Sequence, residues 1–382
     1  MNKKNEYNQL ISDFLNINTN NIYFYWKGRV ALYAILKSFG IKEGDEVILP
    51  GFTCVVVPNA IKYLNAKPVY VDIEKDCLCP SFETIKNAIT EKTKAIICQN
   101  TFGLSFQVDL IADYAKKNNI YTIEDCTHGF GGKYNGKPNG TYCDASFFST
   151  QWNKPFSTGI GGFAIINNNS LKIQIEDINK QLITPTFKDK FILQLLLYAK
   201  NKILTRKNYW QLRNIYRILS KHNLIIGSSQ GVELESLSIP KEYFKNISDV
   251  QLNEGIKNIS ELKNNIKKRI GNAKKYTDFL ISQDKYHVSY EFNENHSFLK
   301  YPLLVRDRNL FEQLAQKAKI ELGDWFCSPI HPVKENLNLW NVEIKKIPIA
   351  FEISNQIVNL PTDIDNIENV ILFLKKNINQ II

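Results

Sequence analysis

The chain has 382 residues, of which 44% are hydrophobic and 12% aromatic. A chain of this length buries a sizeable core and more readily forms two folded units than one, so a disordered protein is excluded. The net charge of +10 suits an anionic partner. Because no zinc-finger or aromatic RNP-type motif accompanies the charge, we expect small anionic ligands and no nucleic acid as partners.

The sequence predicts neither an export signal nor a membrane span. The N-terminus, MNKKNEYNQLISDFL, mixes charged and apolar residues at helical spacing and differs from the apolar stretch of a signal peptide. No later run reaches membrane-spanning length, so we expect a cytoplasmic protein. The seven cysteines show neither CxxC pairs nor neighbouring histidines that complete a zinc site, which predicts reduced thiols and no metal.

Short β-branched runs alternate with amphipathic stretches between residues 29 and 166. In chain order the runs are EVILP, PVYVDI, KAIICQN, YTIEDC and GGFAIIN. Such alternation is typical of βαβ units, in which helices cover a parallel sheet. We therefore predict an α/β fold, with a large domain built on a mostly parallel central sheet covered by helices.

The pattern changes after this region. Residues from about 168 to 240 are basic and helical with no strand signal, which predicts a helical insertion within a large domain of residues 1–240. Residues 241–382 then form a smaller C-terminal α+β domain. It opens with SDVQLNEGIKNISELKNNIKKRIGNAKKYTDFL, which predicts one long helix, and continues with strands such as FLKYPLLV and helices such as RNLFEQLAQKAKI.

Two polar segments follow predicted strands of the large domain. The first, IEDCTHGFGGKYNGKPNG, begins as a strand that ends in Glu124 and Asp125 and runs into glycine-rich chain. Ligands of α/β sheets bind beyond the carboxyl ends of the strands, so Asp125 is placed to meet a ligand. An aspartate that only caps a helix is the alternative for this segment alone.

The second segment, DASFFSTQWNKPFSTGIGGFAIIN, places Lys154 between a predicted strand and a glycine-rich turn. A lysine by itself is usually a solvated surface charge. A pyridoxal-phosphate site needs both a lysine amine for a Schiff base and a carboxylate that keeps the pyridine nitrogen protonated. Gly28 precedes an amphipathic helix whose first turn can hold a phosphate, although a glycine that merely starts a helix is commoner.

In this order the segments resemble the DegT-type sugar aminotransferases, a family of fold type I pyridoxal-phosphate enzymes. The resemblance runs from about residue 25 to 166 and resumes from about 247 to the end. It is carried by GIKEGDEVILPGFTCVVVPNAI, AKPVYVDIEKD, ITEKTKAIICQNTFG, IEDCTHGFGGKYNGK, FFSTQWNK, SPIHPV and IVNLPTD. It implies pyridoxal 5'-phosphate as the cofactor.

The resemblance also implies roles for residues at the reacting end of the site. Lys154 is the catalytic residue, which forms the Schiff base with the cofactor and then moves protons. Asp125 pairs with the pyridine nitrogen, and His128 packs against the cofactor ring. A histidine that merely packs in the core is the alternative for His128.

At the phosphate end, the resemblance implies that Ser149 and the backbone amides of Arg29 and Val30 bind the cofactor phosphate. Relatives have a threonine where this chain has Arg29, whose guanidinium can bind either the cofactor phosphate or a substrate phosphate in a bidentate fork. His331, in SPIHPV, matches a histidine at the substrate end of the site. A loop position between prolines is the alternative for His331.

The function implied by this resemblance is an aminotransferase that moves an amino group from an amino acid, most simply glutamate, to a keto-sugar. A nucleotide-linked sugar for surface glycans or amino-sugar synthesis is the expected acceptor, and a homodimer the expected assembly. A non-catalytic cofactor-binding sensor is the alternative from another class of protein. A racemase and a dehydratase are alternatives among pyridoxal-phosphate enzymes, although dehydratases of this kind replace the lysine with histidine, and Lys154 is present.

Residues 188–221 combine apolar patches with many lysines and arginines and a single acid, Asp189. A basic amphipathic helix of this kind can lie on an anionic membrane, and Tyr209 and Trp210 stand among cations as headgroup-binding aromatics do. This predicts peripheral contact with the inner membrane face. The commoner alternative is that the apolar stripe packs on the enzyme or on its dimer partner.

Overall fold

The computed structural model describes residues 2–205, 208–221, 225, 232–240 and 242–382. Its centre is a seven-stranded sheet in the order β1-β10-β9-β6-β5-β2-β4, in which β9, β6, β5, β2 and β4 run parallel and β10 runs antiparallel to β9 and β1. The bounds are β1 (Ile22–Tyr25), β2 (Glu46–Pro50), β4 (Lys67–Val71), β5 (Thr93–Gln99), β6 (Tyr121–Asp125), β9 (Ala145–Ser149) and β10 (Gly162–Ile166). The predicted mostly parallel sheet is confirmed.

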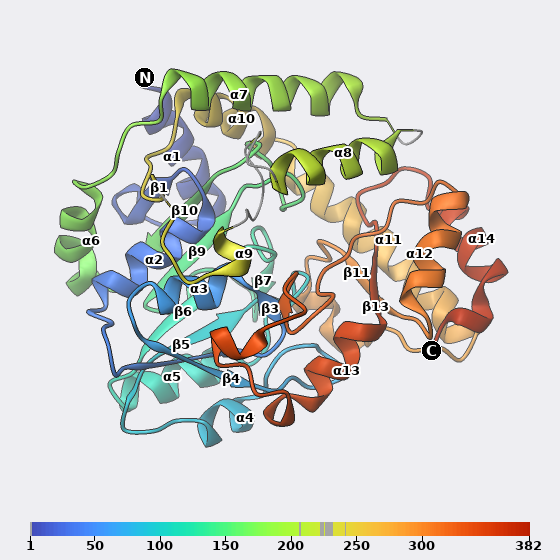
Figure 1. The fold of residues 1–382 in the computed structure, drawn as a ribbon, viewed down its shortest axis with the longest axis horizontal. Coiled ribbons are helices and arrows are strands. Elements are labelled where there is room, and N and C mark those ends of the chain that lie inside the picture. Colours follow the sequence, from blue (N-terminus) through green and yellow to red (C-terminus); the bar gives the residue numbers. More distant parts are fainter. Residues whose placement is uncertain (1, 206–207, 222–224, 226–231, 241) are drawn as a thin grey trace.

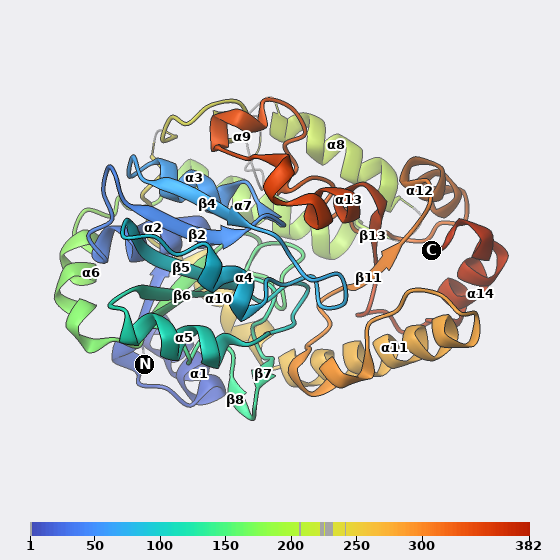
Figure 2. The same ribbon diagram turned by 90° about the horizontal axis from the view of Figure 1, so that it is seen from below.

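Helices cover both faces of the sheet (Figures 1 and 2). Side chains alternate between the two faces: Val47 and Leu49 pack in the core beneath one layer of helices, and Ile48 packs on the opposite face. The first layer holds α2 (Gly28–Ser38), α3 (Val56–Lys62) and α6 (Lys172–Asn179). The opposite layer holds α1 (Lys3–Leu15), α4 (Phe82–Asn87), α5 (Val108–Lys117) and α10 (Asp249–Ile259).

The prediction of one long helix is wrong in one respect. The segment forms two helices, α10 and α11 (Leu262–Ser282), which are separated at Ser260 and Glu261. α10 packs on α1 in the large unit, whereas the later part of α11 packs in the core of the C-terminal unit. The chain turns because the two helices serve different cores. No glycine or proline marks the break in the sequence.

The C-terminal unit is small and mixed. Its two strands pair antiparallel, and its helices surround them (Figure 2). The bounds are β11 (Tyr301–Leu304), α12 (Arg308–Lys317), α13 (Pro348–Gln356), β13 (Ile357–Leu360) and α14 (Glu368–Lys376). A short parallel pair, β12 (Ile330–His331) with β3 (Thr53–Cys54), joins this unit to the large one. A hairpin of β7 (Lys133–Tyr134) and β8 (Lys137–Pro138) projects from the large unit.

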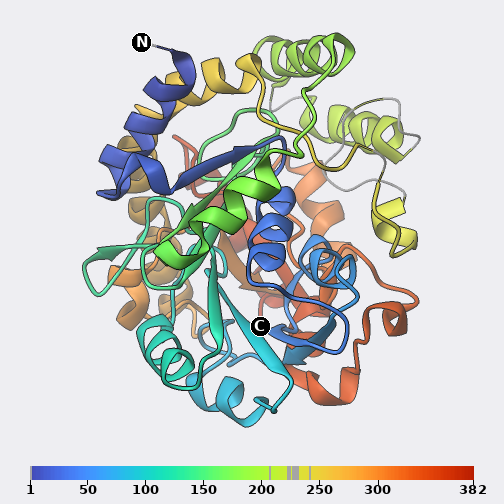
Figure 3. The same ribbon diagram turned by 90° about the vertical axis from the view of Figure 1, so that its left-hand side faces the viewer.

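The helical segment between β10 and α10 spans both units along one side of the molecule (Figures 1 and 3). It comprises α7 (Phe187–Tyr198), the π-helical turn η3 (Ala199–Ile203), α8 (Tyr209–Lys221) and α9 (Val232–Glu235). Leu193 and Leu197 of α7 pack on the large unit, whereas Trp210 of α8 packs in the C-terminal core. Within the described ranges, no helix is both long enough and apolar enough to cross a membrane.

Candidate active site

A cavity of about 900 Å³ opens between the large unit, the C-terminal unit and the α7–α8 segment. Three neighbouring strands end at it, and their last residues, Gln99 of β5, Asp125 of β6 and Ser149 of β9, line its wall. Parallel strands end at the same edge of a sheet, and Gln99 and Asp125 are direct partners in the register. The sheet itself therefore brings these side chains together.

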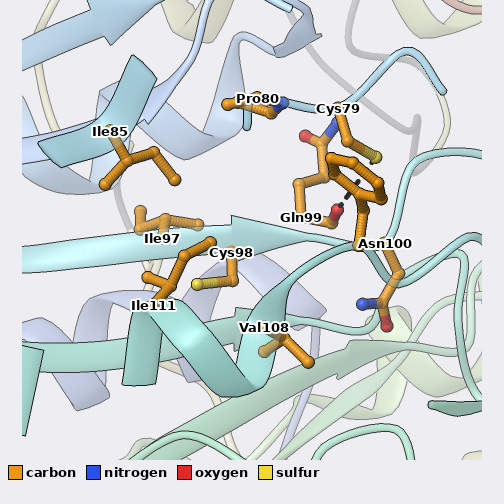
Figure 4. Close-up of a pocket in the computed structure, with 10 residues that line it drawn as sticks. Cys79, Pro80, Ile85, Ile97, Cys98, Gln99, Asn100, Val108 and Ile111 are labelled. Carbon is orange, nitrogen blue, oxygen red and sulfur yellow. Dashed lines mark hydrogen bonds between the residues drawn. The ribbon is translucent and has the colours of Figure 1, made fainter. Parts of the chain in front are cut away.

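A second cavity lies beside the end of β5, where Cys79, Pro80, Gln99 and Asn100 contribute to its lining (Figure 4). Its volume is about 10 Å³. A space of that size holds one water molecule at most, so it is no ligand site. The large cavity is the candidate site in the part of the chain that the structure describes.

Lys154 lies in the loop between β9 and β10, with its side chain in the large cavity. Burial lowers the pKa of its amine to about 8, which the positive charge of Arg29 favours and the nearby Cys54 and Asp125 oppose. The Nζ atom lies 4.4 Å from the centre of the Trp325 ring. A lysine with this pKa supplies a substantial fraction of neutral amine near neutral pH, as a nucleophile requires.

The loop that carries Lys154 is held from several elements. Lys200 Nζ, from η3, donates to the carbonyl oxygen of Trp152 at 3.0 Å, and Arg269, from α11, donates to that of Pro155 at 3.0 Å. Trp152 Nε1 in turn donates to the Tyr216 hydroxyl of α8 at 3.1 Å. These bonds fix the backbone on both sides of Lys154, which limits where its amine can move.

Asp125 is 3% exposed, and its Oδ1 atom accepts a hydrogen bond from the backbone N–H of Thr127 at 3.0 Å. Burial raises the pKa of the carboxyl, while the Thr127 bonds and the Lys154 charge oppose that shift. The neighbouring Glu124 points elsewhere, because its carboxylate accepts from the N–H of Gly140 at 2.7 Å. Asp125 is therefore the carboxylate of this strand end that lines the cavity.

His128 is buried at the same end of the cavity, and burial lowers its pKa well below the usual value. Its Nδ1 atom accepts from the backbone N–H of Phe102 at 3.2 Å, so a neutral ring carries its proton on Nε2. The Trp325 ring stacks on it, with centroids 4.5 Å apart and planes at 19°. A cofactor ring that packed on this face of His128 would have to take the place of Trp325.

The N-terminus of α2 abuts Ser149, since a Cβ atom on Gly28 would stand 3.0 Å from Ser149 Cβ. Lys27, Gly28 and Arg29 line the cavity. Val30 does not: its N–H donates to the carbonyl oxygen of Lys27 at 3.1 Å, and its side chain is in the core. The prediction that the Val30 amide faces a phosphate thus differs from the observed turn, in which that donor is already used.

The guanidinium of Arg29 forms a buried ion pair with Glu233 of α9. The sequence predicted that the guanidinium of Arg29 binds a phosphate. In this structure it contacts the carboxylate of Glu233 instead. Glu233 is itself fixed, because its carbonyl oxygen accepts from Asn59 Nδ2 at 2.8 Å. A phosphate at Arg29 would have to compete with this pair.

The same end of the cavity nevertheless offers donors that suit an anionic group. Gln151 Nε2 and Thr53 Oγ1 are buried, lie on residues that line the cavity, and have no hydrogen-bond partner within the described ranges. Buried donors without partners cost free energy, which a phosphate oxygen would recover. Lys27 adds a cation, although burial lowers its pKa to about 8. These groups fit the phosphate of pyridoxal phosphate.

His331 also lines the cavity, where β12 pairs with β3 and aligns it with Cys54. Its Nδ1 atom lies 3.3 Å from both the backbone nitrogen and the Sγ atom of Cys327. The structure thus brings Lys154, His128 and His331 into one cavity, together with the other predicted site residues Arg29, Asp125 and Ser149.

Sequence reasoning missed several residues of this site. Trp325, which stacks on His128 and lies under Lys154, stands six residues before His331, and that proximity was the available signal. Glu233 and Lys200 come from the helical segment, which lacks any catalytic pattern. Their roles depend on tertiary packing, which spacing along the chain does not reveal.

The architecture of a parallel sheet with helices on both faces, a small C-terminal unit and a lysine cavity at the strand ends defines the fold type I class. A solved DegT DnrJ EryC1 StrS aminotransferase from Brucella abortus superposes with a TM-score of 0.74 at 18% identity, over 99% of this chain and 90% of that one. A family model described as the DegT/DnrJ/EryC1/StrS aminotransferase family matches residues 4–201 and 212–369. The chain belongs to this family, which confirms the resemblance.

Curated relatives match over a shorter stretch. GDP-perosamine synthase of Escherichia coli O157:H7 is 44% identical over 144 residues, which is 38% of this chain and 40% of that protein. L-glutamine:scyllo-inosose aminotransferase of Streptomyces griseus is 32% identical over 151 residues, 40% of this chain and 36% of that protein. The matches thus span about two fifths of the length of these relatives.

Proposed function

We propose that this protein is a pyridoxal-phosphate-dependent aminotransferase that moves an amino group from an amino acid, with glutamate as the expected donor, to a keto-sugar. The observation that carries the proposal is the shared cavity of Lys154 and Asp125. The lysine there has a pKa of about 8, and the carboxylate lies at the end of the neighbouring strand. Membership of an aminotransferase family and the similarity to sugar and cyclitol aminotransferases support it.

When bound, pyridoxal phosphate supplies an aldehyde that captures amines and a ring that withdraws electrons from the reacting carbon. Asp125 would hold a proton at the ring nitrogen, and burial strengthens that ion pair. Lys154 Nζ would release the cofactor to the amino donor. As a neutral amine it would then accept a proton and pass it on. Ser149, Gln151 and Lys27 would bind the phosphate, with Arg29 joining them only when Glu233 releases it.

The proposal is tested by adding glutamate to the purified, cofactor-loaded protein. A transaminase converts from the yellow pyridoxal form to the colourless pyridoxamine form and releases 2-oxoglutarate. The pyridoxamine form, loaded with a ¹⁵N amine, is then offered keto-sugars, and the label is followed by mass. Glutamate that leaves the spectrum unchanged, with glutamine and aspartate equally inert, would favour a non-catalytic sensor.

The assembly and location are proposed as well. We expect a homodimer, whose mass can be measured by light scattering after gel filtration. We also expect a cytoplasmic location and peripheral membrane contact through residues 188–221. Part of that segment is not at the surface: Trp210 is 8% exposed and packs in the C-terminal core, with the guanidinium of Arg213 over its ring at 4.1 Å. The prediction that Trp210 meets headgroups is therefore wrong, and the exposed residues of α7 and α8 would make any such contact.

A further inference from the structure

The cavity has two ends of different chemistry. The inner end, around Lys154, is lined by polar and charged side chains, as described above. The outer wall comes from described residues between 196 and 235, which contribute nine aliphatic side chains, among them Leu196, Leu212 and Leu219, together with the polar side chains of Lys200, Tyr209, Arg213, Tyr216, Ser220 and Glu235. Aliphatic side chains cannot bond the hydroxyl groups of a sugar or the edges of a base, so the aliphatic part of this wall suits an apolar ligand group.

The same wall continues to the surface at the mouth of the cavity. Ile203, Leu204 and Ile215 line the cavity and are also 49%, 39% and 51% exposed. Side chains that line the cavity and are also this exposed form its rim. A ligand can thus lie across the rim with one part inside and one part outside.

α7 extends this apolar surface away from the mouth. Its inner face packs through Leu193 and Leu197, yet its outer face exposes Phe187, Phe191 and Leu195, with Phe187 84% exposed. A helix that is apolar on both faces is usually covered on both. The outer face therefore fits an apolar surface outside the chain.

Cations accompany the apolar surface. Residues 187–221 contain nine lysines and arginines and one acid. Lys300 and Lys334 of the C-terminal unit also line the cavity, together with the acids Glu312 and Asp324. This pairing of aliphatic and cationic groups complements an ester of phosphate with an aliphatic chain, which is the chemistry of a lipid phosphate at a membrane surface.

Part of the rim lies outside the stretches that the family model matches. The two stretches matched by the family model leave out residues 202–211, and Ile203 and Leu204 fall within that gap. The inner end of the cavity lies entirely within the matched stretches. Two of the three rim residues therefore lie outside the matched stretches, whereas Ile215 lies within them.

We propose that the outer part of the cavity binds an aliphatic chain of the prenyl type, so that the acceptor is a keto-sugar carried on a lipid phosphate and taken from a membrane surface. This inference rests on the proposed function. In this arrangement the sugar reaches Lys154, the phosphate groups meet the cations of the middle of the cavity, and the chain leaves along Ile203, Leu204 and Ile215 toward the outer face of α7.

The test compares two probes that share a diphosphate and differ in the group it carries. Farnesyl diphosphate, below its micellar concentration, and GDP are titrated into the cofactor-loaded protein by calorimetry. Farnesyl diphosphate is expected to bind about tenfold more tightly than GDP, because the aliphatic side chains of the rim pack against an apolar chain and form no hydrogen bonds with a nucleoside. Ile215→Asp should weaken farnesyl diphosphate binding about tenfold, since a carboxylate cannot be desolvated against the chain.

Ile218→Asp is the matched control, because Ile218 is on the same helix and 60% exposed but does not line the cavity. It should leave farnesyl diphosphate binding unchanged. Tighter binding of GDP, or equal effects of the two substitutions, would overturn the proposal. So would an Ile215→Asp protein whose assembly changes in light scattering while farnesyl diphosphate still binds, since the rim would then be an interface between copies. Conversion of the wild-type protein by glutamate is scored separately and decides the proposed function alone.

Discussion

The two ends of the cavity differ in what builds them. The ends of β5, β6 and β9 present polar side chains to the inner end, and the sheet register determines their places. Helices that bridge the two units form the outer wall, with aliphatic side chains and a gap in the family match. The comparison indicates that the sheet places the reacting groups, whereas the outer wall, to which we assign the choice of acceptor, reaches the inner end through Lys200 and Glu233.

The largest expected effect concerns the inner end. Lys154→Ala removes the amine that attaches the cofactor and moves the proton, so the glutamate half-reaction should slow by about a thousandfold or more. Because Lys154 belongs to a loop and not to the apolar core, the melting temperature of the apoprotein should hardly change. A rapid half-reaction in this variant would place the reacting amine elsewhere.

Asp125→Asn should retain the cofactor but slow the half-reaction by about a hundredfold, because an amide cannot hold the charge at the ring nitrogen. Glu124→Gln is the matched control, since Glu124 is the adjacent carboxyl on the same strand and bonds Gly140 instead of lining the cavity. Stopped-flow absorbance compares the two. Equal slowing by both substitutions would mean that Asp125 acts only through the stability of the strand end.

The bond from Lys200 to the Lys154 loop joins the outer segment to the inner end of the cavity. Lys200→Gln loses the bond to the Trp152 carbonyl and loosens the loop of Lys154, so the half-reaction should slow roughly tenfold. Lys202→Gln removes the same charge from an exposed position of the same turn and should have no effect. If the two variants behave alike, the effect is one of overall charge, and the two ends of the cavity are independent.

The smallest effect is a shift with pH. Cofactor attachment needs neutral Lys154, whose pKa of about 8 means that the rate should rise as the pH passes through about 8. Asp125 raises this pKa and Arg29 lowers it, so Asp125→Asn should move the midpoint down and Arg29→Gln should move it up. The midpoint is measured from the rate of yellow colour formation in apoprotein. Shifts of the same sign in both variants would contradict the assigned charges.

Much of the inner end was predictable from the sequence, because strand ends and the loop after β9 are local features. IEDC and FFSTQWNK placed Asp125, Ser149 and Lys154 correctly in one cavity. The partner of Arg29 was not predictable, since Glu233 is brought there only by packing of α9 on α3. The break before α11 was not predicted either. The chain turns there because the two helices pack in different cores, and no local sequence signal marks the turn.

The outer wall was harder to predict from the sequence than the inner end. Its basic and apolar composition was visible, yet Trp210, chosen for contact with headgroups, is buried, whereas Phe187 is 84% exposed. Composition cannot tell which face of a helix turns inward when both faces are apolar. That choice depends on where the two units lie, which only the tertiary structure shows.

The central claim is that Lys154 carries the cofactor and yields it to an amino donor. It is tested most directly by reducing the loaded protein with borohydride, digesting it and locating the added phosphopyridoxyl mass. The account predicts this mass on the peptide that contains Lys154, and its loss when glutamate is added before the reduction. Modification of a different lysine, or a mass on Lys154 that persists after glutamate, would contradict it.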